Sequence, residues 1–592
     1  MSDAAVESSP EKPLALESGA VVGGPDAGAE AAIETNSVAA AAQPGILEGL
    51  GIAGRLGVSE RAAFWLGIAG IVAVAALLRV VNLSTRGTWD ADQGHDMLVL
   101  RDLVQRGQVP LLGPPTSIGD FHHGVLYYFL LAPAAAISGA DPLGVTLAIA
   151  LAGIAAVAVT AWLGRAIGGT TAGLVAGLLM AVSASAVDES TFIWNPNLIA
   201  LSSSIALAAA WHAWQARRPR WWIVAGAAAV VTVHLHVLGI VLTPVIAGLL
   251  VADLVRRRQL GDPDGTPEVV SAIGWWIVLA VASYVPLAIH EAQSGASELR
   301  AAAAFLLGGG EPAATSLPAR LPIVGLRVLG WPLTGLITAA PIATLLSTTL
   351  VVVLAVWRGW LVRPRTDSAV DERTGIRWLG LGLAWTIAGL AVGASSLATV
   401  VLGLPNDHYH AFADPMVFVV AGVGVAALLR MARSAARTGP EAVLRRAAAI
   451  SAAALVLVLV GWNLLHEPPA VAADGGWPAA RIAAVRIFDA TGGKPVTLES
   501  LPAVKSADAI RFPLERVAPG IVADAAPSSA PGGPARVILC DQLFHESIGA
   551  DCGGPAEDVL ARQATTGAVT PPLIDRFEAA PGRWISIYAP VS

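Results

Sequence analysis

The sequence predicts an all-α polytopic membrane protein of about eleven transmembrane helices, followed by a small C-terminal α/β domain. Only 14% of its 592 residues are charged, whereas soluble domains carry about 25%. The mean hydropathy is +0.64, and apolar runs recur at about 20 residues, the length that a helix needs to cross the hydrocarbon core. The runs are too long for barrel strands, which alternate over about 10 residues.

Residues 1–60 are rich in Ala, Gly, Pro, Ser and Glu and have no apolar periodicity. This composition predicts a disordered cytoplasmic tail. The segment lacks the basic start and short apolar core of a signal peptide. The first span is therefore expected at Ala62–Leu83, inside a transmembrane domain of residues 61–466.

Ten further apolar runs are interpreted as spans. They cover residues 144–163, 170–187, 197–215, 221–236, 238–255, 269–290, 338–357, 378–403, 414–430 and 447–465. With a cytoplasmic tail, every strongly basic short loop falls on the cytoplasmic side of the cell (plasma) membrane, as the positive-inside rule requires. These loops contain Arg165, Arg217, Arg218, Arg220, Arg256, Arg257, Arg258, Arg358, Arg363, Arg365, Arg430, Arg433, Arg437, Arg445 and Arg446.

The same orientation places a long first loop, residues 84–143, and the C-terminal residues 467–592 outside the cytoplasm. Residues 122–138 are also apolar, but counting them as a span would reverse every later loop. We therefore expect a helix in the outer interface there, with a re-entrant segment as the alternative. Residues 467–592 contain short strand-like segments, which predict a soluble extracytoplasmic domain.

The two cysteines of the chain, Cys540 and Cys552, both lie in this last segment. A pair of cysteines twelve residues apart in an oxidising compartment is typical of a disulfide. Two unrelated thiols are the alternative interpretation.

The first external loop begins with "RGTWDADQGHDMLVLRD", which concentrates acids directly after the first span. The simplest interpretation is a solvated loop without a function. However, apolar residues recur at helical spacing after Asp96, with Arg101, Asp102 and Arg106 on another face, which indicates an amphipathic helix on the membrane surface. Acids beside such a helix suit chemistry on a lipid headgroup, because a carboxylate there can act as a general base.

The order of the first span, the acidic outer loop, "PLLGPPTS", "HHGVLYYFLLAP" and "WNPN" resembles the GT-C glycosyltransferases. The resemblance covers about residues 62–430. It is closest to the bacterial branch related to protein O-mannosyltransferases and the lipid A aminoarabinose transferase. The resemblance implies an integral membrane glycosyltransferase that takes a sugar, with inversion, from a polyprenyl-phosphate donor. The acceptor would be a glycan, lipid or protein at the extracytoplasmic face, within cell-envelope glycan biosynthesis.

Carried over residue by residue, the resemblance places Asp92 at the family's loop carboxylate, with Asp90 as the rival catalytic base. Gln93 stands where the family commonly has Glu. His122 matches a second family carboxylate, and Asn195 falls near a further family Asp. One base suffices in this reaction, because the lipid phosphate leaves as a stabilised anion.

Further polar residues of the external loops are candidate substrate contacts. The full set of candidates is His95, His122, His123, Tyr127, Asn195, His408, Tyr409 and His410. The last three lie where family members often hold the donor phosphate. His234 and His236 are either functional or merely interfacial. External arginines suited to a lipid phosphate are Arg300, Arg320 and Arg327.

No cofactor is expected, since the spacing of acids and histidines matches no metal-binding motif. A divalent cation held by Asp90, Asp92, His122 and His123 is the alternative. The partners are the donor lipid, the acceptor and membrane lipids, without nucleic acid.

Two other functions stay open at this point. A transporter or lipid flippase would place polar residues along span interiors near mid-membrane, whereas here they gather at outer ends. A non-catalytic scaffold with a cell-wall-binding external domain is the second alternative. Gln93, His122 and Asn195 keep it open, because each replaces an expected acid.

Overall fold

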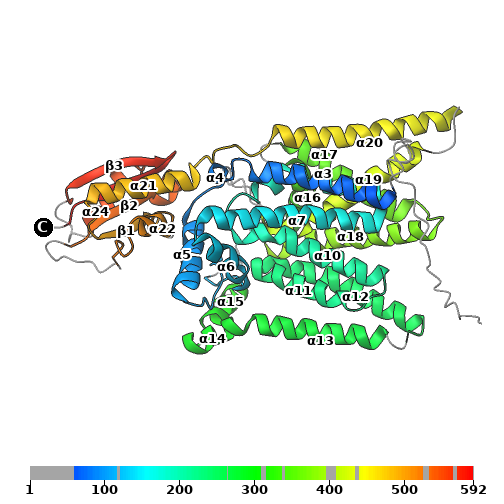
Figure 1. Ribbon diagram of the computed structural model, residues 1–592, viewed down its shortest axis with the longest axis horizontal. Coiled ribbons are helices and arrows are strands. Elements are labelled where there is room, and N and C mark those ends of the chain that lie inside the picture. The colour runs from blue at the N-terminus through cyan, green and yellow to red at the C-terminus, as the bar shows by residue number, and fades with distance from the viewer. Residues whose placement is uncertain are drawn as a thin grey trace, which may run out of the picture. The chain divides into compact units, whose positions relative to one another are not determined.

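The computed structural model describes residues 59–590 except 117–119, 263–264, 309–314, 336–339, 395–407, 434–438, 504, 524–532 and 564–569. The tail predicted for residues 1–60 lies almost wholly outside this range, as does the end of the span predicted at 378–403. Long helices run side by side through most of the described chain, and four strands follow near its C-terminal end (Figure 1).

Within the described residues, eight helices are long and apolar enough to cross a membrane. The chain is thus a multi-pass membrane protein. The eight segments are α3 (Glu60–Val80), α7 (Pro142–Gly168), η2 with α12 (Val237–Gln259), α13 (Gly265–Ser283), α17 with η3 (Pro341–Leu361), α18 (Asp367–Gly393), η5 with α19 (Tyr409–Ala432) and α20 (Gly439–Leu465).

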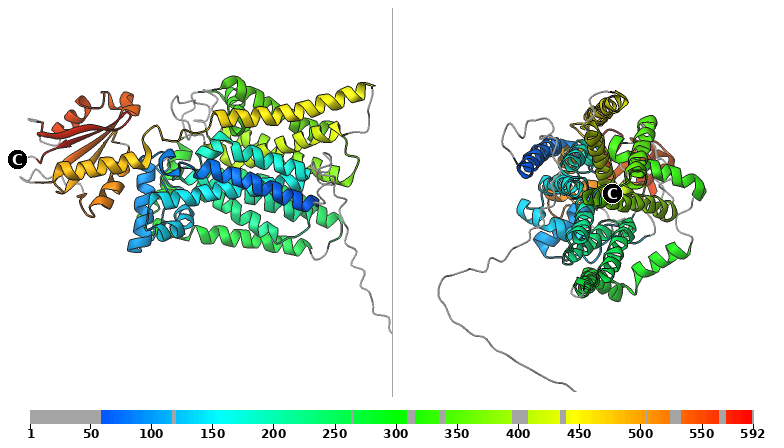
Figure 2. Two further views of the ribbon diagram at one scale, coloured as in Figure 1. Left: turned by 45° about the horizontal axis from the view of Figure 1, so that its top comes forward. Right: turned by 90° about the vertical axis from the view of Figure 1, so that its right-hand side faces the viewer.

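The other three predicted spans are shorter helices, α8 (Thr170–Val182), α10 (Ile199–Gln215) and α11 (Trp221–Leu235). At 1.5 Å per residue, α8 is only about 20 Å long, so its crossing of the membrane stays a prediction. α8 and α10 are largely buried. By contrast, α13 and α20 are the least buried of the eight candidate spans and lie on opposite sides of the bundle (Figure 2).

Helix α16 (Leu317–Thr334) is absent from the predicted set. Its sequence contains two internal prolines and two arginines, which interrupt the apolar pattern. Arg320 donates to the carbonyl of Ala391, near the end of α18 (3.0 Å). The carbonyl of Pro332 accepts a hydrogen bond from Ser183, at the end of α8 (2.7 Å). Because both contacts lie at the same end of the bundle, α16 crosses over that end instead of spanning.

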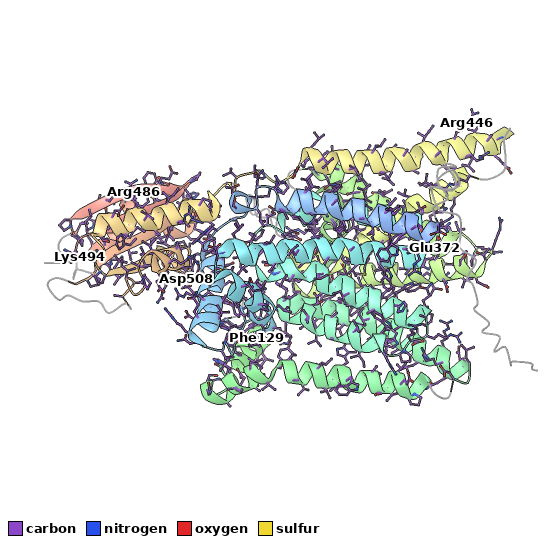
Figure 3. All side chains as sticks on the ribbon, in the orientation of Figure 1. Phe129, Glu372, Arg446, Arg486, Lys494 and Asp508 are labelled. Carbon is purple, nitrogen blue, oxygen red and sulfur yellow. A yellow bond between two sulfur atoms is a disulfide. The ribbon has the colours of Figure 1, made fainter. Side chains whose placement is uncertain are left out.

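The opposite end of the bundle carries a cluster of arginines around one carboxylate. Glu372 of α18 accepts hydrogen bonds from Arg358 (Nε, 2.9 Å) and from Arg430 (Nη2, 2.6 Å). Arg430 also donates to the carbonyl of Gly168, at the end of α7 (3.2 Å). Glu372 and Arg446 lie at this end, and Phe129 lies at the other (Figure 3). The arginines thus gather at one end, although the side of the membrane that this end faces stays a prediction.

The first loop forms α4 (Leu83–Arg86), α5 (Ala91–Arg106) and α6 (Leu126–Ser138). The expected amphipathic helix is α5, and α6 is the helix expected after the two histidines. The helices α14 (Val285–Ser294) and α15 (Ser297–Leu307) lie at the same end of the bundle as this loop (Figure 1). The short segments α9 (Ala184–Asp188), η1 (Asn195–Leu198) and η5 (His408–Ala413) each directly precede or follow a longer helix or another short segment.

The C-terminal segment is a small mixed α/β domain, as predicted. Its sheet has the order β1-β2-β4-β3. β1 (Val496–Leu501) runs parallel to β2 (Ala535–Asp541), while β4 (Arg583–Tyr588) is antiparallel to both β2 and β3 (Leu573–Ala580). Its main helices are α21 (Gly476–Thr491), α22 (Asp508–Val517) and α24 (Pro555–Gln563).

The central strands β2 and β4 carry most of the buried apolar side chains of this sheet. Cys540 in β2 is bonded to Cys552 with an S–S distance of 2.05 Å. This bond confirms the predicted disulfide.

Candidate functional site

The start of α5 is fixed against the C-terminal domain. The indole of Trp89 donates to the carbonyl of Ala509 (2.8 Å) and packs on Trp477, with ring centroids 4.6 Å apart. Gly94 permits the close approach of α5 and α22, because a Cβ there would lie 2.1 Å from the carbonyl oxygen of Asp508. The acidic loop and the C-terminal domain therefore form one packed unit.

Asp90, at the N-cap of α5, is paired with two cations of the C-terminal domain. Arg583 donates from Nη2 to Oδ1 of Asp90 (3.1 Å) and from Nη1 to the carbonyl of Trp89 (2.7 Å). The Lys505 ammonium lies 3.9 Å from Oδ2 of Asp90. These two cations therefore lie beside both oxygens of the Asp90 carboxylate.

Asp92 lies in the first turn of α5 and its side chain reaches solvent. Protein nevertheless surrounds this carboxylate closely, and the resulting burial, together with Asp90, raises its pKa. Lys505, His95 and a hydrogen bond from the Trp194 indole act in the opposite direction. Asp92 is thus a solvent-reached carboxylate with a raised pKa, which are two properties of a general base.

Gln93 replaces the acid that the family resemblance implies, and the structure gives a reason. Its side-chain oxygen accepts the backbone N–H of Asp90 (2.8 Å), and its side-chain nitrogen donates to the carbonyl of Ile193 (2.8 Å). The side chain is only 3% exposed. A carboxylate could accept the first hydrogen bond but could not donate the second, so the amide is required by these partners.

His95 and Asp96 follow on the same helix. His95 Nδ1 lies 3.2 Å from Oδ2 of Asp508, and this hydrogen bond raises the pKa of His95. Asp96 is buried and accepts hydrogen bonds from the hydroxyls of Tyr127 (2.7 Å) and Tyr128 (2.9 Å). Burial raises the pKa of Asp96 to about 7.

Three of the candidate substrate contacts are buried and have protein partners. Tyr127 is fully buried and its hydroxyl binds Asp96. Asn195 is 4% exposed and its amide donates to the carbonyl of Leu235. His410 is fully buried, with Nδ1 3.1 Å from Asp414. Sequence alone placed these residues near the site but could not reveal their partners.

The two adjacent histidines before α6 have different partners. His122 binds Glu298 of α15 through Nδ1 (3.0 Å) and through its backbone N–H (2.8 Å). His123 accepts the backbone N–H of Val237 (3.3 Å) and packs on His236, with ring centroids 4.7 Å apart. Burial and the neighbouring His122 lower the pKa of His123 to about 4, so the His123 imidazole is neutral near pH 7.

His122, His123 and His234 line a cavity of about 240 Å³. Its other walls are mostly apolar and include Leu111, Leu112, Val233, Val237, Ile240, Tyr284 and Leu287. His234 is 1% exposed and its Nε2 lies 2.8 Å from the Ser283 hydroxyl. Gly124 packs directly on His234, because a Cβ at Gly124 would lie 1.9 Å from Nδ1. Asp90 and Asp92 do not line this cavity.

A short chain of contacts joins Asp92 to the histidine cavity. Trp194 binds Asp92, and the next residue, Asn195, binds the backbone of Leu235. His236 follows Leu235 and packs on both His123 and Tyr409, the latter with ring centroids 5.4 Å apart. The acids and the histidines therefore belong to one connected region. The side chain of His408 lies outside the described residues.

Two of the three arginines singled out from the sequence have backbone carbonyls as partners. Arg320 donates to the carbonyls of Thr315 and Ala391, and Arg300 donates to the carbonyl of Ala296. Among the described residues, no group of three His, Cys, Asp or Glu side chains is placed to hold a metal ion. The cations beside the acids are Lys505 and Arg583, which sequence analysis missed because no motif marks them.

Residues 122–284 match the family model described as dolichyl-phosphate-mannose-protein mannosyltransferase. The fold is similar to that of ArnT from Cupriavidus metallidurans bound to undecaprenyl phosphate (TM-score 0.52, 16% identity, 88% of this chain and 97% of that chain). It is also similar to ArnT from the same organism in the apo state (TM-score 0.51, 17% identity, 89% and 98%). These matches confirm the resemblance drawn from the sequence.

A weaker similarity is to the archaeal oligosaccharyltransferase AglB from Archaeoglobus fulgidus (TM-score 0.45, 11% identity, 82% of this chain and 70% of that chain). Among curated proteins, no match to this sequence was found.

Proposed function

From the family match of residues 122–284 and the fold shared with ArnT, we propose that this chain is a membrane glycosyltransferase of the GT-C type. The donor would be a sugar linked to a polyprenyl phosphate, and the acceptor a glycan, lipid or protein at the extracytoplasmic face. One relative binds undecaprenyl phosphate in its solved structure, which supports this class of donor.

The observation that carries the proposal is the environment of Asp92. A general base must reach the acceptor hydroxyl, and it works best with a pKa nearer to the working pH. Asp92 is open to solvent and has a raised pKa. Asp90 is instead held by Arg583 and Lys505, so we assign base duty to Asp92 and a positioning role to Asp90.

In the proposed step, Asp92 accepts the proton of the acceptor hydroxyl while the hydroxyl oxygen attacks the anomeric carbon. A new C–O bond forms as the bond between that carbon and the phosphate oxygen breaks. The electron pair of the broken bond stays on the lipid phosphate, which needs no proton to leave. A single displacement of this kind inverts the anomeric configuration.

The histidine cavity is the proposed location for part of the substrate. Its mostly apolar walls suit an isoprenoid or sugar face, while its histidines offer hydrogen bonds. Of the candidate contacts, we retain His122 and His123, which line the cavity, Tyr409, which packs on His236 beside His123, and His95, which is 41% exposed near Asp92. His408 is retained from the resemblance alone.

A transfer assay tests the proposal. Membranes containing the full-length protein would be given a panel of radiolabelled polyprenyl-phosphate hexoses and pentoses, and label transferred to acceptor would be counted. We expect transfer from at least one donor, and a loss of about 10²–10⁴-fold on Asp92→Asn, the usual range for a general base. Asp489→Asn, at an exposed acid of the C-terminal domain, is the matched control. Undiminished transfer by Asp92→Asn would overturn the assignment of Asp92 as the base.

A further inference from the structure

We propose that Lys505, supplied by the C-terminal domain, is a positioning cation of the acidic site and makes that domain part of the catalytic machinery. The inference rests on the proposed function and deepens it. The sequence of residues 467–592 predicts a separate soluble domain. The contacts of Lys505 assign part of that domain to the reaction itself.

Lys505 is held between an aromatic ring and a carboxylate. Its ammonium lies 5.4 Å from the centroid of the Phe544 ring and 3.9 Å from Oδ2 of Asp90. A cation over an aromatic face is stabilised by the electrons of the ring. Phe544 ends the short helix η6 (Gln542–Phe544), whose start is capped by the Asp541 carboxylate accepting the Leu543 N–H (3.0 Å). The ring therefore provides a fixed support for the ammonium.

Lys505 and Arg583 have different tasks at this acid pair. The Arg583 side chain is 10% exposed and joins Asp90 to Asp541. It binds the carbonyl of Trp89 as well, so it fixes the loop to β4. Lys505 is 35% exposed and makes no such backbone contact among those described. Its charge is therefore available at the solvent side of the site.

The groups that face Asp92 come from three parts of the chain. Asp90 and His95 lie on or beside its own helix, Trp194 comes from the loop before η1, and Lys505 comes from the C-terminal domain. Of the groups that favour the ionised form of Asp92, Lys505 has the largest effect, ahead of His95 and Trp194. His95 is also hydrogen-bonded to Asp508, so it interacts with the carboxylate of Asp508 as well as with that of Asp92.

The direction of the effect follows from these charges. A general base works only when it is deprotonated, so transfer falls as pH drops through the pKa of Asp92. Removing the Lys505 charge raises the pKa of Asp92 further. The fall in rate on the acid side of the pH profile, the acid limb, then moves to higher pH. Below the pKa, the rate falls about tenfold per pH unit, so the loss is larger at low pH than at high pH.

Removing Lys505 does not remove the contacts that dock the domain. Thr88 still binds Asp474 (2.7 Å), Arg101 still binds Glu515 (2.7 Å), and Trp89 keeps its hydrogen bond to Ala509. A Lys505 variant should therefore fold and dock as the wild type does, which makes the substitution a usable test.

The experiment compares full-length Lys505→Met and Lys505→Arg with wild type. Lys494→Met is the matched control, since Lys494 is an exposed lysine of the same domain. Two readouts are followed against pH. The first is the rate of sugar transfer. The second is the labelling of Asp92 by dicyclohexylcarbodiimide, which reacts with protonated carboxyls, measured by mass spectrometry of the peptide. The second readout needs no transfer activity.

We expect Lys505→Met to move both midpoints to higher pH, and Lys505→Arg and Lys494→Met to keep the wild-type midpoints. If wild type transfers sugar but Lys505→Met shifts neither midpoint, the inference falls and the proposed function stands. A rise in KM for the donor without a shift in either midpoint also overturns it. If wild type transfers no sugar while the labelling midpoint still shifts, the proposed function fails and the action of Lys505 on Asp92 stands.

Discussion

The substitution Gln93→Glu, which restores the acid implied by the family resemblance, should destabilise this protein. Gln93 donates to the carbonyl of Ile193 at 2.8 Å and accepts the Asp90 N–H at 2.8 Å. A carboxylate keeps the acceptor and loses the donor, which leaves the Ile193 carbonyl without this hydrogen bond. Leaving a buried acceptor unsatisfied costs about 1–3 kcal/mol. Burying the new charge at a position that is 3% exposed adds to this cost.

The pH dependence of the variant's stability shows whether the buried carboxylate causes the destabilisation. When the new carboxyl is protonated it can donate to Ile193 again, so its pKa in the folded state is raised above that of the unfolded chain. The folded variant therefore loses stability as pH rises through this window, and the variant is closest to wild type at low pH. Thermal unfolding of the purified protein at pH 5 and pH 8 measures the effect, with Gln93→Met as a pH-independent control. A Gln93→Glu protein as stable as wild type at pH 8 would refute the reasoning.

Three other outcomes are expected. The pKa of Asp96 is raised from 3.8 to about 7. The stability of the wild type should therefore fall relative to that of Asp96→Asn as pH rises from about 4 to about 7. A difference in unfolding midpoint that stays constant over this range would contradict the expectation. Arg583→Met should weaken docking of the C-terminal domain by about 2 kcal/mol. This loss is smaller than that expected on breaking a fully buried ion pair, because Asp90 is partly exposed. Protease cleavage between the domains should then accelerate, and unchanged cleavage would exclude the role of Arg583 in docking. Cys540→Ser with Cys552→Ser should lower the stability of that domain by about 2–4 kcal/mol, and thiol labelling of the unfolded wild type before reduction would exclude the bond.

The membrane-spanning part of the fold was largely predictable because its signal is local. All eight candidate spans coincide with predicted runs, since twenty apolar residues in a row have few other structures open to them. The disulfide was predictable because the chain offers a single pairing. Helix α16 was not, because its prolines and arginines break the apolar pattern, and its place over the end of the bundle depends on contacts with Ala391 and Ser183.

The candidate site was predictable only in part. Asp90 and Asp92 were found from the sequence because a motif and a helix start mark them. Lys505 and Arg583 lie more than 400 residues later in the chain, and only the tertiary contacts bring them to the acids. For the same reason the partner of Tyr127 could not be predicted, because nothing in the local pattern shows that its hydroxyl binds the buried Asp96.

We propose Asp92 as the base of a sugar transfer from a lipid phosphate. The most direct measurement is the pH dependence of a single round of transfer by Asp92→Asn, Asp90→Asn and wild type. We expect an acid limb in wild type and in Asp90→Asn. The residual transfer of Asp92→Asn, lower by about 10²–10⁴-fold, should have no such limb. An Asp92→Asn protein with the wild-type rate and the wild-type acid limb would show that Asp92 is not the base.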